Sequence, residues 1–508
     1  MTMGFRTTAL AIIACVGLVA QTASAQAPSL GTIHFPTSAK PVAQAPFETG
    51  VKALYNFEFD QARVAFQEAG KADPDFALAA WGEAMSYNHP LWAEQNREAG
   101  LQALSRMGPT PAARAAKTPE GKERGLMQAI DVLYGEGDKL VRDNAYAAAM
   151  GNLSKRFPDD DEIAVMHALS LLGTVRQGDT GFRHQMQAGA IAERVLRANP
   201  DHPGAAHYVI HSFDDPEHAP LSLWAARAYA KIAPDAPHAL HMPSHIFVQL
   251  GMWEDVVASN TKAYAAADAL ATRMNLPRGR EDFHALSWLM YGNLQLGKID
   301  AAKANLQTAR DIAKKDSSER VMDGLASMEA RFVVETERWQ DLPAPGEPMS
   351  DSKAETSGAH MAHAYDNNSA VLFVAGLSAA KLGNVAAAQK ALATLTAGRE
   401  KMQATTGGAY RSKQMTVLEK SAGAAIAMAK KDLAAAEALL KEAVATEASL
   451  AAPSGPPDIM KPSFESYGEM LLAANRSAEA AAQFQQALLR TPNRAKSVQG
   501  LARATAGK

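Results

Sequence analysis

The sequence has a single cysteine, few aromatic residues and no long hydrophobic stretch beyond its N-terminal segment. Cys15 is the only cysteine among 508 residues, so a chain cleaved after Ala25 would contain no disulfide and no thiolate nucleophile. After that segment, no run of about 18 apolar residues is long enough to cross a bilayer. We therefore expect a mature chain that is soluble and has no transmembrane segment.

The chain also lacks an excess of charge of either sign. It has 51 Lys and Arg residues against 54 Asp and Glu residues. A nucleic-acid partner requires a concentrated basic face, and the near balance argues against one. Gly-rich phosphate loops, His-Glu-x-x-His motifs and serine-centred catalytic elbows are absent as well, so the sequence identifies no catalytic residue.

The first 25 residues have the pattern of an export signal. Arg6 supplies a positive charge, an apolar run covers residues 9–20, and Ala23-Ser24-Ala25 forms a small-x-small cleavage site before Gln26. We expect a signal peptide over residues 1–25 and an exported, most simply periplasmic, product. An alternative takes Ile12-Ile13-Ala14-Cys15 as a lipoprotein box that anchors the chain through Cys15.

The rest of the chain favours helices over strands. Alanine and other helix-favouring residues are abundant, and runs that alternate apolar and polar residues are scarce. Residues 26–46 contain four prolines and little periodicity, which predicts a flexible lead-in. Residues 341–363, rich in proline, glycine and polar residues, predict a loop between two helical parts.

One spacing of residues recurs at both ends of the chain. A small residue, an aromatic residue, a second small residue and a proline follow one another at offsets of four, three and five. The two copies are Ala62, Phe66, Ala69 and Pro74, and Ala480, Phe484, Ala487 and Pro492. Small residues at helical spacing allow two helices to pack closely, and the proline ends the second helix.

This pattern resembles the tetratricopeptide repeat (TPR) family of helix-turn-helix proteins. The resemblance covers about residues 47–506 and implies an all-α, TPR-like solenoid. It divides the chain into N-terminal repeats over residues 47–340 and C-terminal repeats over residues 364–508. In this family the first helices of successive repeats line a concave groove that binds protein or peptide partners.

The stretch from Pro200 to Gly251 holds half of the chain's 14 histidines in a regular register. A shift of 34 residues carries the pair His207 and His211 onto the pair His241 and His245. Residues four apart lie on the same helix face, and His238 joins the second pair three residues before His241.

The TPR resemblance implies that these histidines point into the groove. Aligning Gly251 with Gly297, a shift of 46, carries His238 onto His284 and His245 onto Tyr291. We therefore expect His238, His284 and Tyr291 on the same face as the two pairs, where they would bind a ligand. A second candidate ligand surface contains Trp81 and His89, although aromatic residues at helical spacing are also typical of a packed core.

The histidines are open to two functional interpretations. The four residues His207, His211, His241 and His245 could give three or four nitrogens to a zinc, iron or copper ion, with Asp214, Asp215 or Glu217 accepting hydrogen bonds from the outer ring nitrogens. The protein would then be a metal-binding protein or a metal-dependent enzyme. Alternatively, the groove binds a peptide, a protein partner or a small ligand without metal, or the histidines only cap and pack helices.

Overall fold

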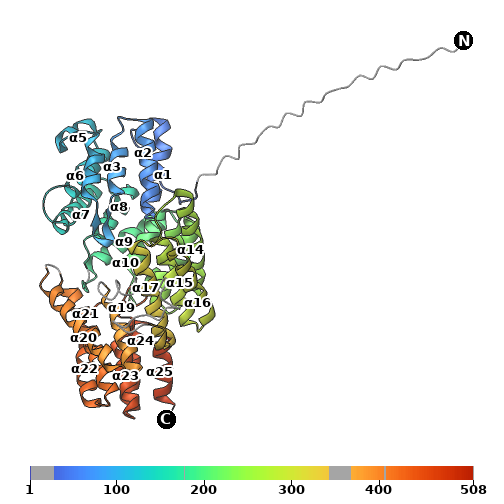
Figure 1. Cartoon of the computed structure of the whole chain (residues 1–508). Helices are drawn as coiled ribbons and strands as arrows, with labels where there is room; N and C mark the ends of the chain where they lie inside the picture. The colour runs from blue at the N-terminus through green and yellow to red at the C-terminus, as the bar shows by residue number, and fades with distance from the viewer. Residues whose placement is uncertain (2–27, 177, 343–367, 406–407, 507–508) are drawn as a thin grey trace.

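The computed structural model describes residues 1, 28–176, 178–342, 368–405 and 408–506. Within these ranges the chain forms a series of α-helices in which sequence neighbours pack against each other (Figure 1). The prediction of an all-α, TPR-like solenoid of helix-turn-helix repeats is confirmed. The predicted signal peptide, its cleavage site and nearly all of the predicted 341–363 loop lie outside the described residues.

In Figure 1 the first part of the chain lies mostly at the top, the helices coloured yellow-green lie on the right, and the C-terminal helices lie at the bottom. The first part contains α1 (Pro41–Tyr55), α2 (Phe59–Ala72), α3 (Ala77–Met85), β1 (Asn88–His89), η1 (Pro90–Trp92), β2 (Glu94–Gln95), α4 (Arg97–Ser105), α5 (Pro111–Lys117), α6 (Lys122–Leu133), α7 (Lys139–Arg156), α8 (Asp161–Leu172) and α9 (Arg183–Ala198). The middle part contains α10 (Pro203–Ser212), α11 (Ala219–Ile232), α12 (Pro237–His241), α13 (Pro243–Gln249), α14 (Trp253–Met274), α15 (Glu281–Gln295), α16 (Ile299–Ala313), α17 (Glu319–Thr336) and η2 (Trp339–Asp341). The last part contains α19 (Ser369–Lys381), α20 (Val385–Gln403), α21 (Ala409–Ala429), α22 (Leu433–Ala448), α23 (Ser463–Ala473), α24 (Ser477–Arg490) and α25 (Ala495–Thr505).

The repeat is built on an aromatic ring held between two glycines. Phe66 of α2 lies against Gly50 of α1 and Gly82 of α3, where an added Cβ would come within 2.8 Å and 2.3 Å of the ring. Near the C-terminus the same arrangement is formed by Phe484 of α24, Gly468 of α23 and Gly500 of α25. Because glycine has no Cβ, three helices approach one ring closely in both places.

The start of the described chain differs from the predicted flexible lead-in. Helix α1 begins at Pro41, inside the range expected to be irregular, because proline is well suited to the first turn of a helix. Before it, Leu30 and Phe35 are buried, and the Thr32 amide donates a hydrogen bond to the Asp201 carbonyl at 2.9 Å. Residues 28–40 are therefore packed onto the helices around α10.

Proline also shapes the helices that carry the histidines. Pro203, Pro237 and Pro243 each occupy the first turn of a helix, namely α10, α12 and α13. Pro243 has no amide hydrogen to donate, so it ends α12 after five residues, and α13 begins directly behind it. The backbone of Met242 between them stays in the right-handed helical region, so His241 and His245 still follow one another at nearly helical spacing.

The C-terminal helices fold back onto the middle of the chain. Gln249 Nε2 donates to the Pro453 carbonyl at 2.9 Å, and Trp253 Nε1 donates to the Asn493 carbonyl at 2.8 Å. No helix in the described ranges has both the length and the apolar character needed to cross a membrane.

A buried ion-pair network joins the same two parts of the protein. Arg494 is fully buried and donates to Glu335 Oε1 at 2.6 Å and to Glu465 Oε1 at 2.7 Å. Its Nη1 also donates to the Tyr291 hydroxyl at 2.9 Å. Since these partners come from α15, α17 and α23, one guanidinium connects the middle helices to the C-terminal helices.

Candidate metal centre

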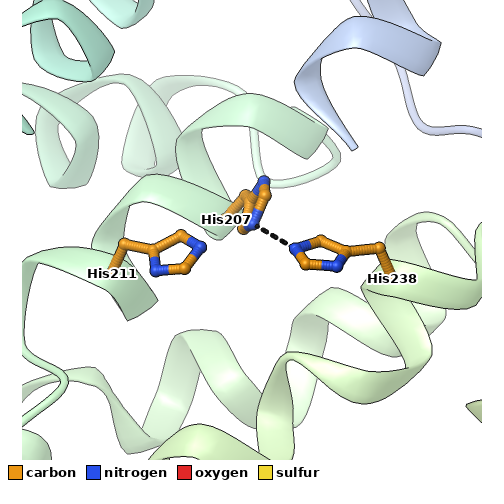
Figure 2. A group of neighbouring side chains, drawn as sticks. All are labelled: His207, His211 and His238. Atoms are coloured by element: carbon orange, nitrogen blue, oxygen red, sulfur yellow. Dashed lines mark hydrogen bonds between the residues drawn. The ribbon is translucent and has the colours of Figure 1, made fainter. Parts of the chain in front are cut away.

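Six histidines from four helices, α10, α12, α13 and α15, gather into two clusters. The first histidine cluster contains His207 and His211 of α10 and His238 of α12 (Figure 2). The second histidine cluster contains His241 of α12, His245 of α13 and His284 of α15. Within each cluster, one nitrogen from every ring lies within 4.8 Å of the others.

In the first histidine cluster, the Nε2 atoms of two rings lie close together, and a third ring lies beside them. His207 Nε2 lies 3.2 Å from His238 Nε2, the contact drawn as a dashed line in Figure 2. His211 approaches from the next turn of α10, with its ring centroid 4.7 Å from that of His207. His211 Nε2 is buried and has no hydrogen-bond partner, which is unusual for a polar atom removed from water.

The second histidine cluster repeats this geometry. His241 Nε2 lies 3.1 Å from His245 Nε2 and 2.9 Å from His284 Nε2. Two nitrogens bound to one tetrahedral zinc ion, with bonds of about 2.0–2.1 Å, are roughly 3.3 Å apart. The contacts of His207 with His238, and of His241 with His245 and His284, are thus close to the separation that two nitrogens have on one shared ion.

Hydrogen bonds on the far side of the rings determine which nitrogen carries the proton. His207 Nδ1 faces the Tyr55 carbonyl at 2.7 Å, and His241 Nδ1 faces Asn260 Oδ1 at 2.7 Å. The Asn260 amide nitrogen donates to the Val256 carbonyl at 2.9 Å, which leaves its oxygen to accept. Both partners are acceptors only, so Nδ1 is the donor in each ring.

Carboxylates accept hydrogen bonds from the Nδ1 atoms of two further rings, those of His238 and His245. His245 Nδ1 donates to Asp214 Oδ2 at 2.7 Å, and His238 Nδ1 donates to Glu281 Oε2 at 3.3 Å. With Nδ1 protonated in a neutral ring, Nε2 keeps its lone pair. Two such lone pairs facing each other at about 3 Å repel unless a proton or a metal ion lies between them, and outer acceptors of this kind are characteristic of metal-binding histidines.

Burial keeps several of these imidazoles neutral. It lowers the pKa of His207, His211 and His241 well below the ordinary value of 6.5. The His284 side chain is exposed where it faces the cavity, yet desolvation by the surrounding protein still lowers its pKa to about 4, with Glu281 acting in the opposite direction. Neutral imidazole is the form that binds a metal ion, so these ligands need not lose a proton first.

The clusters open into a large cavity that is lined by residues of the first, middle and C-terminal parts of the chain. The cavity has a volume of about 2210 Å³. Four of the six cluster histidines lie on its wall, namely His211, His238, His245 and His284. Residues 450–459 also line it, and Gly455 in this segment packs so closely on the Trp288 ring that an added Cβ would lie 2.4 Å away.

The structure gathers His207, His211, His241 and His245, the predicted metal ligands, in two groups rather than one. Each His-x-x-x-His pair is instead completed by a histidine from a helix further along the chain, His238 of α12 for the first pair and His284 of α15 for the second. His238 faces His207 of α10, whereas His241 of the same helix faces His284 of α15. The 46-residue alignment of His238 with His284 therefore identifies the third member of each cluster.

Three predicted ligand-binding residues lie in other surroundings. Trp81 is fully buried against Phe66, because α3 is covered on all sides by neighbouring helices. Tyr291 lies two turns beyond His284 on the same helix, about 10 Å along the axis, where it contacts Arg494. His89 does line the cavity, stacked on Phe59 at 4.0 Å, but it belongs to neither cluster.

Several residues of the site were not identified from the sequence. Asn260 and Glu281 hold ring nitrogens of His241 and His238, and Trp288 packs on the second histidine cluster with its ring centroid 4.6 Å from that of His245. Glu281 could have been identified from the sequence, because it lies only three residues before His284, which the 46-residue alignment had already selected. Of the predicted acidic partners, Asp214 binds a cluster histidine, whereas Asp215 binds His218 instead.

Comparisons with known proteins identify no family for this chain. No protein-family model and no curated protein matches it. The human IFIT1 dimer with m7Gppp-AAAA is 13% identical, over 93% of this chain and 91% of that chain, with a TM-score of 0.39. Yeast Tom70 is 12% identical, over 91% of this chain and 95% of that chain, with a TM-score of 0.33. At such TM-scores these likenesses carry no argument, so the following proposals rest on the chain's own residues.

Proposed function

We propose that this protein binds transition-metal ions at its two histidine clusters, on the wall of a cavity that admits a further ligand. The observation that carries the proposal is the fixed orientation of the rings. His207, His238, His241 and His245 each direct Nδ1 to an acceptor and Nε2 toward another imidazole. A purely structural cluster would place a hydrogen-bond donor against each inner nitrogen.

The ligand set favours ions that prefer imidazole. Three neutral nitrogens per cluster suit zinc, copper or iron, and do not suit magnesium or calcium, which take oxygen ligands. Three protein ligands also leave at least one coordination position unfilled, as in catalytic rather than structural zinc sites. Since four of the six rings line the cavity, that position is accessible to water or to a bound molecule.

The direct test is metal content. Protein produced without a polyhistidine tag is expected to contain stoichiometric zinc, copper or iron by elemental analysis, or to take it up when the apo protein is reconstituted. Bound metal should also raise the unfolding temperature, because an ion that binds only the folded state stabilises it. The variant His245→Ala should lower the metal content while the circular dichroism spectrum stays helical.

The matched control is His218→Ala. His218 also donates Nδ1 to a carboxylate, that of Asp215, at 2.8 Å, but it lies outside both clusters. Its removal should leave metal content unchanged. Absence of stoichiometric metal after reconstitution with all three ions would overturn the proposal and leave the histidines as polar groups on the wall of an organic-ligand or peptide-binding cavity.

The size of the cavity supports a second candidate function, the binding of an organic molecule or a peptide. Sites for small molecules usually enclose about 300–1,000 Å³, and this cavity is larger at about 2210 Å³. A peptide segment or a sizeable organic molecule would fit its dimensions. In the metal-bound form such a molecule would lie beside the open coordination positions, which is the arrangement of a metal-dependent enzyme.

A further inference from the structure

The two histidine clusters lie as close to each other as their own members do. The His211 and His245 ring centroids are 5.9 Å apart, and those of His238 and His241 are 6.2 Å apart. Within the first histidine cluster, His211 and His238 are separated by 6.4 Å. The boundary between the clusters is thus no wider than the span inside one of them.

The clusters are also built by one rule applied twice. Two histidines four residues apart receive a third ring from a helix further along the chain, α12 for the first histidine cluster and α15 for the second. Helix α12 supplies a member to each cluster. One ring in each cluster is held by a carboxylate: His238 by Glu281 and His245 by Asp214. Equivalent ligands and equivalent charge predict two sites of similar affinity for the same ion.

We infer that the six histidines hold two metal ions as a single paired centre, joined on the cavity side by a small bridging ligand such as hydroxide. This inference rests on the proposed metal binding and specifies its form. In two-metal sites the ions are about 3.5–4 Å apart, a separation that adjoining triads allow.

Charge balance supports the bridging ligand. Two divalent ions bring four positive charges, and the six imidazoles that contact them are neutral. Asp214 and Glu281 supply one negative charge each from behind the rings. The remaining positive charge faces the cavity through His211, His238, His245 and His284, and an anion between the ions would neutralise part of it. Small anions and oxygen-donor molecules are therefore the class of ligand that this centre takes.

The inference is tested by loading apo protein with copper(II) and counting unpaired spins by electron paramagnetic resonance at low temperature. A paired centre should bind two copper ions per chain but show a spin count well below two, or a half-field signal from coupled spins. Addition of azide, a small bridging anion, should change the spectrum. These measurements use the unaltered chain, so they do not depend on whether a variant folds.

Variants of one cluster at a time test whether the coupling between the two copper spins needs both clusters. His284→Ala removes a ring that faces the cavity, and His211→Ala removes one from the other cluster; each should leave one copper ion with the full signal of an isolated spin. His218→Ala should keep the coupled spectrum. Two copper ions with two full, isolated spins would overturn the pairing and leave the proposed metal binding intact. A single ion in the unaltered chain would overturn it too, whereas no copper at all would contradict the proposed function itself.

Discussion

At the scale of the residue, the partner of the outer ring nitrogen distinguishes a ligand histidine from a packing histidine. His241 and His245 would be unremarkable as neighbours four residues apart on a helix. Asn260 and Asp214 distinguish them, because each accepts a hydrogen bond from Nδ1 of one ring. The Nε2 atom of that ring is then the one that could bind a metal ion. The sequence could predict that histidines with this spacing face one way and that Asp214 could accept from one of them, but Asn260, 19 residues beyond His241, leaves no local pattern.

The outer carboxylate provides the first residue-scale prediction. Asp214→Asn keeps the shape of the side chain but removes the charge that makes His245 a stronger ligand. Loss of such a partner typically lowers metal affinity by about 10–100-fold, and we expect a decrease in that range by competition with a chelator of known affinity. Asp215→Asn, which alters the partner of His218, is the control; equal losses in both variants would contradict a specific role for Asp214.

At the scale of the element, the helices and their repeat were predictable because the packing is periodic. The small–aromatic–small spacing around Phe66 and Phe484 correctly indicated where three helices meet. The interruption at Pro243 was also visible, since an internal proline has a known effect. By contrast, Leu30 and Phe35 are isolated apolar residues in a segment without periodicity, and nothing local indicated that both are buried.

The glycines around Phe66 allow the repeat packing to be tested. Gly82→Ala would place a Cβ 2.3 Å from the Phe66 ring, and overpacking of this kind costs about 1–3 kcal/mol of unfolding free energy. Gly70→Ala on α2 would meet its nearest atom at 3.5 Å, so it should be neutral or stabilising by up to about 1 kcal/mol. Urea unfolding monitored by circular dichroism compares the two; similar midpoints would show that the ring can move aside.

At the scale of the whole molecule, the C-terminal helices pack against the middle of the chain and cover the groove that carries the histidines, so that it becomes a cavity. The TPR resemblance implied an open concave surface, and the contacts of Gln249 and Trp253 with residues of the C-terminal part close it. These contacts join positions more than 200 residues apart, so no repeat spacing could indicate them. The same closure removes Tyr291 from the ligand surface, since Arg494 covers its hydroxyl.

The closure should depend on Arg494. Arg494→Met would remove the cation and leave Glu335 and Glu465 facing each other in the interior, where an uncompensated buried charge costs about 3–5 kcal/mol. The matched control is Arg476→Met, because Arg476 also pairs with two carboxylates, Glu437 and Glu479, but is partly exposed. We expect a large fall in the unfolding temperature for Arg494→Met and a small one for Arg476→Met by calorimetry. Comparable falls would mean that the apolar contacts around Trp253, rather than the buried ion pairs, hold the C-terminal helices against the helices that carry the two histidine clusters.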